Sequence, residues 1–220
     1  MALSKTNITP PEPDRDCALC PRLVKFRQKN RKSYPDFFNG AVSSFGDLGA
    51  RLMILGLAPG LQGANKTGRP FTGDFSGVLL FKCLEAMGWT DGINENRADD
   101  TLALHDVIIT NAVRCVPPEN RPTTHEVQNC KPYLLARFDA LPNLKVIFAL
   151  GKVAHDAAVR NFGLKLVDYK FAHGAVHPLP KGLTLVDSYH CSRYNVNTGR
   201  LTEDMFMQAM SIARQELAQH

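Results

Sequence analysis

Two pairs of cysteines carry the clearest metal-binding pattern in this 220-residue chain. Cys17 and Cys20 form a C-x-x-C pair, and fourteen residues separate Cys115 from Cys130. In a chain without a secretion signal, two such pairs favour a four-thiolate site that holds either zinc or an iron–sulfur cluster. The spacing leaves the metal open, and it also leaves open that Cys115 and Cys130 are buried apolar residues.

A glycine-rich segment is the second feature with chemical potential. Residues 56–77 read GLAPGLQGANKTGRPFTGDFSG and lie between two apolar runs. Such loops bring backbone close to a phosphate or a flat ring. A nucleotide-hydrolysing P-loop is disfavoured, because the G-x-x-x-x-G-K-S/T spacing is absent and only Gly63 stands three residues before Lys66.

Alternating strands and helices must position these groups. Short apolar runs that end in polar or glycine residues predict strands, and segments with helical periodicity and capping signals predict helices between them. Thr123 with Glu126 forms a capping-box pattern, and Ser76 and Thr202 are the expected caps of two other helices. The expected strands are 51–57, 106–115, 144–151 and 183–190, and the expected helices are 17–30, 76–89, 123–141, 152–163 and 201–219.

This alternation predicts a parallel sheet with helices on both faces. Ligands of such folds bind beyond the carboxyl ends of the strands. The segments that follow these ends are rich in asparagine, histidine, arginine and glycine, so the chemistry is expected at one edge of the sheet. In contrast, Cys83 on an apolar helix face and Cys191 are more consistent with core or loop positions.

The length suits one domain, residues 17–220, preceded by a flexible proline-rich arm, residues 1–16. The net charge of +5 permits binding to a polyanion without establishing it. No apolar run reaches the roughly 20 residues of a membrane span, and the N-terminus lacks the apolar core of a signal peptide. We therefore expect a soluble intracellular protein with no membrane partner.

Three motifs in the same order resemble the uracil-DNA glycosylase superfamily, and most closely its iron–sulfur-containing family 5. They are GLAPGLQGANKTGRPFTGDFSG, NAVRCVPPENRPTTHEVQNC and SYHCSRYNVNTGRLT. The similarity runs from about Cys17 to about Leu201.

The resemblance implies an α/β fold, a three-layer α/β/α sandwich on a four-stranded parallel sheet. It implies a structural [4Fe-4S] cluster on Cys17, Cys20, Cys115 and Cys130. It also implies excision of deaminated bases from double-stranded DNA, to leave an abasic site. We expect a monomer in the cytoplasm of a bacterium or archaeon.

The same resemblance assigns a base pocket. Phe71 matches the position on which the flipped base stacks, and Asn111 matches the amide that reads the base edge. Gly56 and Ala58 would let backbone approach the base. His190 matches a histidine that donates to the base carbonyl oxygen as negative charge develops there.

A DNA-binding loop is implied next to this pocket. Ser192 and Asn195 complete the motif that begins at His190, and would bind phosphate or shape the loop. The loop 193–200 would enter the minor groove, with Tyr194 or a neighbour as the wedge. Arg193 and Arg200 flank it as phosphate contacts. Weaker phosphate-contact candidates are Lys66, Arg69 and Arg121.

The residue that positions the attacking water is the open point. Uracil-specific relatives carry Asp, Glu or Asn where this chain has Leu57 and Ala58. The next polar candidates are Gln62, Asn65 and Asp74. Asn65 is favoured, and Asp74 could instead cap the following helix. With weak water activation, the reaction would rely on stabilisation of the departing base. The family 5 resemblance implies a pocket less tuned to uracil, which also accepts deaminated purines such as hypoxanthine or xanthine.

The main rival is a non-catalytic nucleic-acid-binding module that carries a metal or cluster, in which the glycine-rich loop only holds phosphate. An iron–sulfur redox protein is disfavoured because the resemblance covers a base pocket as well as the cysteines. His105, His155 and His177 lack a motif context and are expected to be structural.

Overall fold

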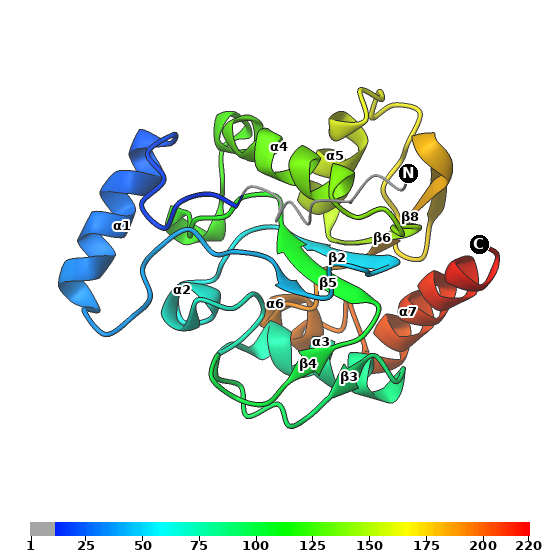
Figure 1. Ribbon diagram of the computed structural model, residues 1–220, viewed down its shortest axis with the longest axis horizontal. Coiled ribbons are helices and arrows are strands. Elements are labelled where there is room, and N and C mark those ends of the chain that lie inside the picture. The colour runs from blue at the N-terminus through cyan, green and yellow to red at the C-terminus, as the bar shows by residue number, and fades with distance from the viewer. Residues whose placement is uncertain (1–11) are drawn as a thin grey trace, which may run out of the picture.

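The computed structural model describes residues 12–220, whose helices and strands are shown in Figure 1. Residues 1–11 of the predicted arm lie outside the described part. The rest of that arm contacts the domain: the carboxylate of Glu12 lies 3.0 Å from Arg114 Nη1, pairs with Arg137, and accepts from the backbone N–H of Ser44.

The central sheet has six strands in the order β1-β5-β2-β6-β8-β7. The four inner strands are parallel and match the four predicted ones: β2 Leu52–Gly56, β5 Val107–Asn111, β6 Val146–Leu150 and β8 Leu183–Ser188. The prediction of a four-stranded sheet was wrong at the edges. There β1 (Phe45–Gly46) and β7 (Val176–Leu179) pair antiparallel to β5 and β8.

Helices cover both faces of this sheet (Figure 1). Side chains of β2 alternate between two apolar cores, as its pleat requires. Ile54 joins a core with α3 (Phe75–Ala86) and α7 (Glu203–Ala218), whereas Met53 joins a core with α4 (Thr124–Asp139) and α5 (Lys152–Asn161). The inner strands are buried on both faces, which explains their continuous apolar sequences.

Two predicted helix starts are confirmed and one is wrong. The Thr123–Glu126 capping box is formed reciprocally, and Thr202 accepts from the backbone N–H of Met205. At α3 the cap is Asp74 rather than Ser76, because the Asp74 carboxylate accepts from the backbone N–H of Gly77 at 3.1 Å.

Several elements lie outside the central sheet and its covering helices. A basic helix near the N-terminus, α1, spans Pro21–Ser33 and lies toward the same side as α2 (Ala64–Thr67) in Figure 1. The strands β3 (Thr90–Asp91) and β4 (Ala103–Leu104) form a separate antiparallel pair. The remaining elements are the short helix α6 (Arg193–Asn197) and two 3-10 turns, Pro118–Asn120 and Pro180–Gly182. Within residues 12–220, no helix combines the length and apolar character needed to cross a membrane.

Candidate active site

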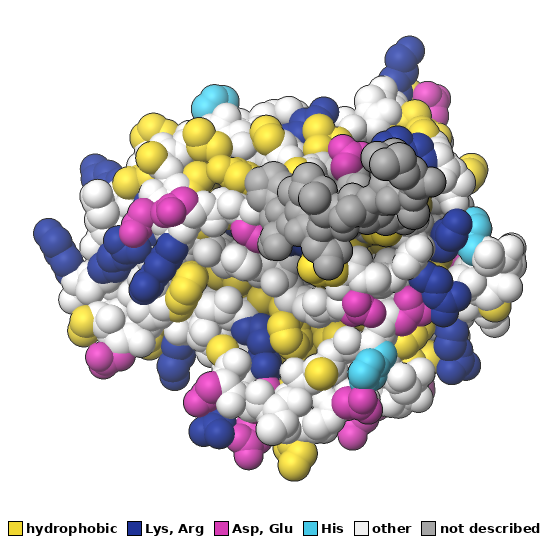
Figure 2. All heavy atoms as spheres, viewed as in Figure 1, with side chains coloured by type: hydrophobic (Ala, Val, Ile, Leu, Met, Phe, Trp, Pro, Cys, Tyr) yellow, Lys and Arg dark blue, Asp and Glu magenta, His cyan; other side chains and the backbone are white. Residues whose placement is uncertain are grey.

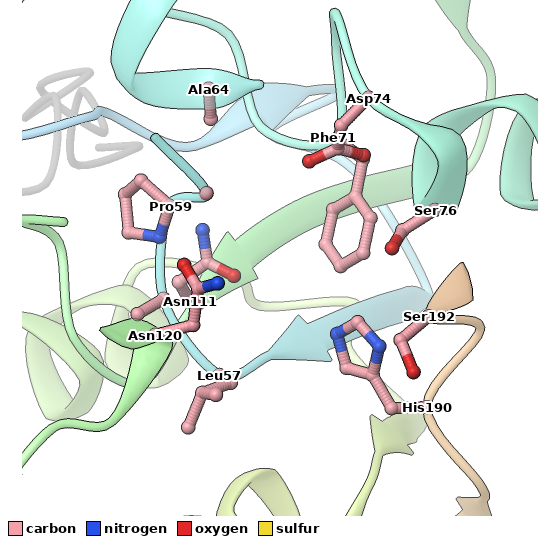
Figure 3. A pocket seen from close by; sticks show the side chains of 12 residues that line it. Leu57, Pro59, Ala64, Phe71, Asp74, Ser76, Asn111, Asn120, His190 and Ser192 are labelled. Carbon is pink, nitrogen blue, oxygen red and sulfur yellow. The ribbon is translucent and has the colours of Figure 1, made fainter. Parts of the chain in front are cut away.

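A cavity of about 280 Å³ lies beyond the carboxyl ends of β2 and β5, where the fold class predicts ligand binding. Figure 3 shows Phe71 from the loop after β2, Asn111 from the end of β5 and His190 from the segment after β8 around it. Its lining comprises Leu57, Ala58, Pro59, Gly60, Ala64, Phe71, Asp74, Ser76, Asn111, Asn120, His190 and Ser192. The sequence-predicted Ala58, Phe71, Asp74, Asn111, His190 and Ser192 therefore lie around one space.

Gly56 lets two of these side chains approach the end of β2. A Cβ atom at this position would lie 2.3 Å from Asn111 Oδ1 and 2.8 Å from Phe71 Cζ. Phe71 itself adopts a left-handed backbone conformation, with φ of 53°, and its carbonyl oxygen would lie 1.7 Å from a Cβ at Gly77. The placement of the Phe71 ring, which is only 7% exposed, thus requires glycine at position 56, and the placement of its backbone requires glycine at position 77.

Asn111 and His190 present polar atoms to the cavity. Asn111 Oδ1 and His190 Nδ1 are buried, and neither has a hydrogen-bond partner among the described residues. Buried polar atoms are usually hydrogen-bonded, so two orphans in one cavity indicate a polar ligand. The ring of His190 lies 6.1 Å from that of Phe71, centroid to centroid, at an interplanar angle of 28°.

His190 follows the end of β8 in a turn that Ser192 and Asn195 hold in place. Ser192 caps α6 by accepting from the backbone N–H of Asn195 at 3.3 Å, and Asn195 Nδ2 donates to the carbonyl oxygen of His190 at 2.8 Å. Both residues therefore shape the turn that carries His190. Burial lowers the pKa of His190, and the negative charge of Asp74 opposes that shift. The imidazole is thereby biased toward its neutral form.

Asp74 occupies the opposite wall of the cavity. One carboxylate oxygen caps α3, and the other lies where a Cβ at Gly63 would be 2.1 Å away and a Cβ at Gly60 3.0 Å away. The glycines of this loop make room for a carboxylate, which combines the capping role with a place in the cavity lining.

Asn65, the favoured water-positioning residue, lies elsewhere. It is fully buried, is not part of the cavity lining, and its Nδ2 donates to Asn39 Oδ1 at 2.9 Å. Its backbone carbonyl accepts from the N–H of Asn39. These contacts connect α2 to the segment that precedes β1.

Asn120 and Ser76 also line the cavity, although the sequence predicted neither as a site residue. Asn120 ends the turn Pro118–Asn120 and has a φ of 54°, a conformation that asparagine tolerates better than most residues. The PPEN sequence signals a turn but not which pocket its last residue reaches. The carbonyl oxygen of Ser76 accepts from Cys191 Sγ at 3.4 Å, and Cys191 is fully buried, in line with the predicted core or loop position.

The predicted DNA-binding loop 193–200 begins as a helix, α6, rather than as an irregular loop. Tyr194 is 72% exposed on it. The guanidinium of Arg193 lies over the ring of Phe75 at 5.5 Å, and that of Arg200 lies over the ring of Tyr189 at 4.7 Å. Aromatic faces thus orient both arginines.

Two of the three weaker phosphate-contact candidates make side-chain contacts within the protein. Arg69 is buried and forms a bidentate pair with Asp100, at 2.6 and 2.8 Å, so neither a phosphate contact nor a solvated charge describes it. The ammonium of Lys66 lies 5.5 Å from the centroid of the Phe37 ring. Arg121 accepts from Arg22 Nη2 through its backbone carbonyl oxygen at 2.9 Å.

The four predicted metal-ligating cysteines gather in one place. Cys20, Cys115 and Cys130 are buried in a small cluster against which Cys17 packs. Arg27 Nη1 lies 3.9 Å from Cys115 Sγ, and Asn129 Nδ2 donates toward Cys20 Sγ at 3.5 Å. Burial raises the pKa of Cys115 to about 12 and that of Cys130 to about 11. Cys83 is also buried, in the core beside α7, as predicted.

Comparison with known proteins places this site in context. The model of the Uracil DNA glycosylase superfamily matches residues 43–214. A type-5 uracil-DNA glycosylase of Thermus thermophilus is 42% identical over 203 residues, which cover 90% of this chain and 92% of that protein. A type-5 enzyme of Pyrobaculum aerophilum is 40% identical over 199 residues, covering 89% and 86%. A type-4 uracil-DNA glycosylase of the same organism is 34% identical over 150 residues, covering 68% and 62%.

The match spans every inner strand of the sheet and each segment that lines the cavity. The chain belongs to the uracil DNA glycosylase superfamily.

Proposed function

We propose that this protein is a monofunctional DNA glycosylase that hydrolyses the N-glycosidic bond of a flipped uracil and leaves an abasic site. Water adds to C1′ of the sugar, and the base leaves with a proton. The observation that carries the proposal is the convergence of an aromatic face and two orphaned polar atoms, on Phe71, Asn111 and His190, in one buried cavity. A duplex hides the bond, so the base must rotate out to reach such a cavity.

The cavity chemistry suits bases that present an N–H beside a carbonyl. Phe71 offers a ring for stacking, and the Asn111 amide supplies both an acceptor and donors. Uracil presents N3–H next to its O4, and hypoxanthine and xanthine present N1–H next to their O6. We therefore extend the proposed substrates to these two deaminated purines.

His190 would stabilise the departing base. Cleavage leaves negative charge on the base carbonyl oxygens, and a donor in a buried site stabilises that charge more strongly than one in water. A neutral imidazole can donate from Nδ1, the atom that has no partner among the described residues. Burial lowers the pKa of His190 and so favours the neutral ring that would donate this hydrogen bond.

Asp74 is the residue that we propose to orient the attacking water. Leu57 and Ala58 line the cavity without any group that could bind water, and Asp74 is the carboxylate in the lining. An ionised carboxylate also stabilises the positive charge that develops on the sugar. Asn65 remains a prediction with no support from its position.

Double-stranded DNA is the proposed partner, bound by a monomer. Exposed Tyr194 on α6 lies next to the cavity wall at Ser192 and is suited to enter the space that the base leaves. Figure 2 shows lysine and arginine side chains grouped over α1. Lys25, Lys29 and Lys32 are exposed there at spacings of four and three residues, which places them on one helix face suited to phosphate contacts.

We further propose that Cys17, Cys20, Cys115 and Cys130 hold a structural [4Fe-4S] cluster. The donors Arg27 and Asn129 face two of the sulfur atoms, an arrangement that suits thiolates rather than thiols. Because burial raises the pKa of Cys115 and Cys130, a bound metal would be needed to keep them ionised. When bound, the cluster supplies covalent cross-links between the start of α1, the segment after β5 and α4.

The test is a panel of duplexes, each with one uracil, hypoxanthine or xanthine, treated with alkali after incubation. We expect strand breaks at the modified base with the wild-type protein, and strongly reduced cleavage with His190→Ala. His105→Ala is the matched control, because His105 is exposed, pairs with Asp91 and is not part of the cavity lining. Intact strands for all three bases, together with retained DNA binding, would instead support the non-catalytic nucleic-acid-binding module.

A further inference from the structure

A second cluster of metal-ligand side chains lies apart from both the cavity and the cysteines. His155 comes from α5, His177 from β7 and Asp187 from β8, and their ligand atoms all lie within 4.8 Å of one another. His155 and Asp187 are fully buried, whereas the His177 side chain keeps 14% of its surface exposed. The cluster therefore has a path to solvent through one ligand.

The Asp187 carboxylate lies between the two imidazole rings. Its Oδ1 is 2.8 Å from His155 Nδ1, and its Oδ2 is 3.2 Å from His177 Nε2. Within residues 12–220 these two histidines are the only ion-pair partners of Asp187. A fully buried carboxylate without a lysine or arginine needs positive charge from one of its two neighbours or from a cation.

The far side of His155 fixes its tautomer. His155 Nε2 lies 2.9 Å from the backbone carbonyl oxygen of Tyr169, which can only accept, so Nε2 carries a proton. In the neutral ring, Nδ1 then holds a lone pair that points toward Asp187. Histidines that ligate metal ions are held in this way, by donation from the opposite nitrogen to a carbonyl or carboxylate.

We propose that His155 Nδ1, His177 Nε2 and the Asp187 carboxylate bind one divalent transition-metal ion, with zinc as the best match. Two imidazoles and a carboxylate are ligands that zinc accepts in a tetrahedral site, with water in the fourth position. The partly exposed His177 side chain gives solvent access to the site. Zinc also supplies the positive charge that the buried carboxylate requires, with both rings neutral.

Binding requires the three side chains to rearrange locally, because ligand atoms that lie up to 4.8 Å apart must approach and the shortest contact must widen. Ligand atoms at about 2.0 Å from a tetrahedral ion are separated by about 3.3 Å, so the 2.8 Å contact between His155 and Asp187 must widen by about half an ångström. The ion would join α5 to the edge strand β7 and to β8. The ion would therefore have a structural role at the edge of the sheet, where its ligand Asp187 lies three residues before His190 in the sequence.

Cobalt titration of the full-length protein tests the proposal. The protein is used as purified, with whatever metal or cluster its four-cysteine site holds left in place. Cobalt in a nitrogen–oxygen site gives weak visible d–d bands, whereas cobalt on cysteine adds intense thiolate charge-transfer bands in the near ultraviolet. We expect saturation at one equivalent without thiolate bands, displacement by zinc, and a higher melting temperature with zinc. His177→Gln should abolish this binding, whereas the exposed, matched His105→Gln should not.

Zinc K-edge X-ray absorption of the wild-type protein at one equivalent keeps the proposal falsifiable even if His177→Gln does not fold. We expect nitrogen and oxygen neighbours with imidazole scattering. No saturable binding, a sulfur shell at one equivalent, or binding unchanged in a folded His177→Gln protein would each overturn the proposal. The cluster would then be a buried imidazolium–carboxylate network.

Discussion

Substitution of Gly56 by alanine probes the tightest contact in the cavity. The added Cβ would lie 2.3 Å from Asn111 Oδ1, whereas ordinary contacts begin at 3.4 Å, so the amide must move by about 1 Å. The ring of Phe71, 2.8 Å from the same Cβ, must also shift. The substitution therefore displaces the stacking and base-reading groups together, without removing either.

The expected loss is large in activity and modest in stability. A displacement of about 1 Å at a reacting site costs roughly 100-fold in rate. Overpacking of a buried site costs about 1–3 kcal/mol, which for a protein of this size lowers the melting temperature by a few degrees. We therefore expect kcat/KM on uracil-containing duplex to fall roughly 100-fold while the variant remains folded at 25 °C.

Single-turnover cleavage and thermal melting are measured on the same preparations. Gly49→Ala is the control, because its nearest neighbours are the exposed Asp47 carboxylate oxygens at 3.3 Å or more. Activity within threefold of wild type in a folded Gly56→Ala protein would show that the positions of Asn111 and Phe71 do not limit the reaction. The proposed base-reading role of the cavity would then be refuted.

Three further outcomes are expected. Because burial lowers the pKa of His190, the midpoint of the acidic limb of the kcat/KM–pH profile should lie below pH 6.5. Asp74→Asn removes the charge that opposes this shift and should move the midpoint to a still lower pH. A midpoint at or above pH 6.5 would contradict the role assigned to His190. Asp100→Asn leaves Arg69 buried without its charged partner and should lower the free energy of unfolding by about 3 kcal/mol in urea melts. Because the pKa of Asp100 is lowered to about 2, the stabilisation by this ion pair is present above pH 4 and is lost as the pH falls toward 2. An unchanged urea midpoint of the variant at pH 7 would contradict a stabilising role of the pair. Purified protein should be brown with about four iron atoms per chain, and Cys115→Ser should abolish the colour, whereas colourless wild type with one zinc would exclude the iron–sulfur cluster.

The sequence was sufficient to predict the elements that depend on local signals. The inner strands are buried on both faces and are read as apolar runs, and the Thr123–Glu126 capping box marks the start of α4 directly. The edge strands β1 and β7 were missed because they are two and four residues long and depend on antiparallel pairing with distant segments.

Site residues that belong to a sequence motif could be predicted. Residues that reach the cavity only through the three-dimensional fold could not. The resemblance assigned Phe71, Asn111 and His190 to one pocket, and the three side chains line one cavity, while their roles stay predictions. Asn65 was favoured from its polarity alone, but it is directed into a buried contact with Asn39. The approach of Asn120 to the cavity depends on a turn with two consecutive left-handed residues, which no short pattern in the sequence predicts.

His190 is proposed to act on a base held in the cavity lined by Phe71 and Asn111. The most direct test of this role is the single-turnover rate of alkali-labile site formation on a uracil-containing duplex, compared between wild type and His190→Ala at saturating enzyme. We predict breaks at the uracil with wild type and a rate at least 100-fold lower in the variant, with unchanged DNA binding. Equal rates in the two proteins, or no breaks with wild type, would show that His190 does not act on a base in this cavity.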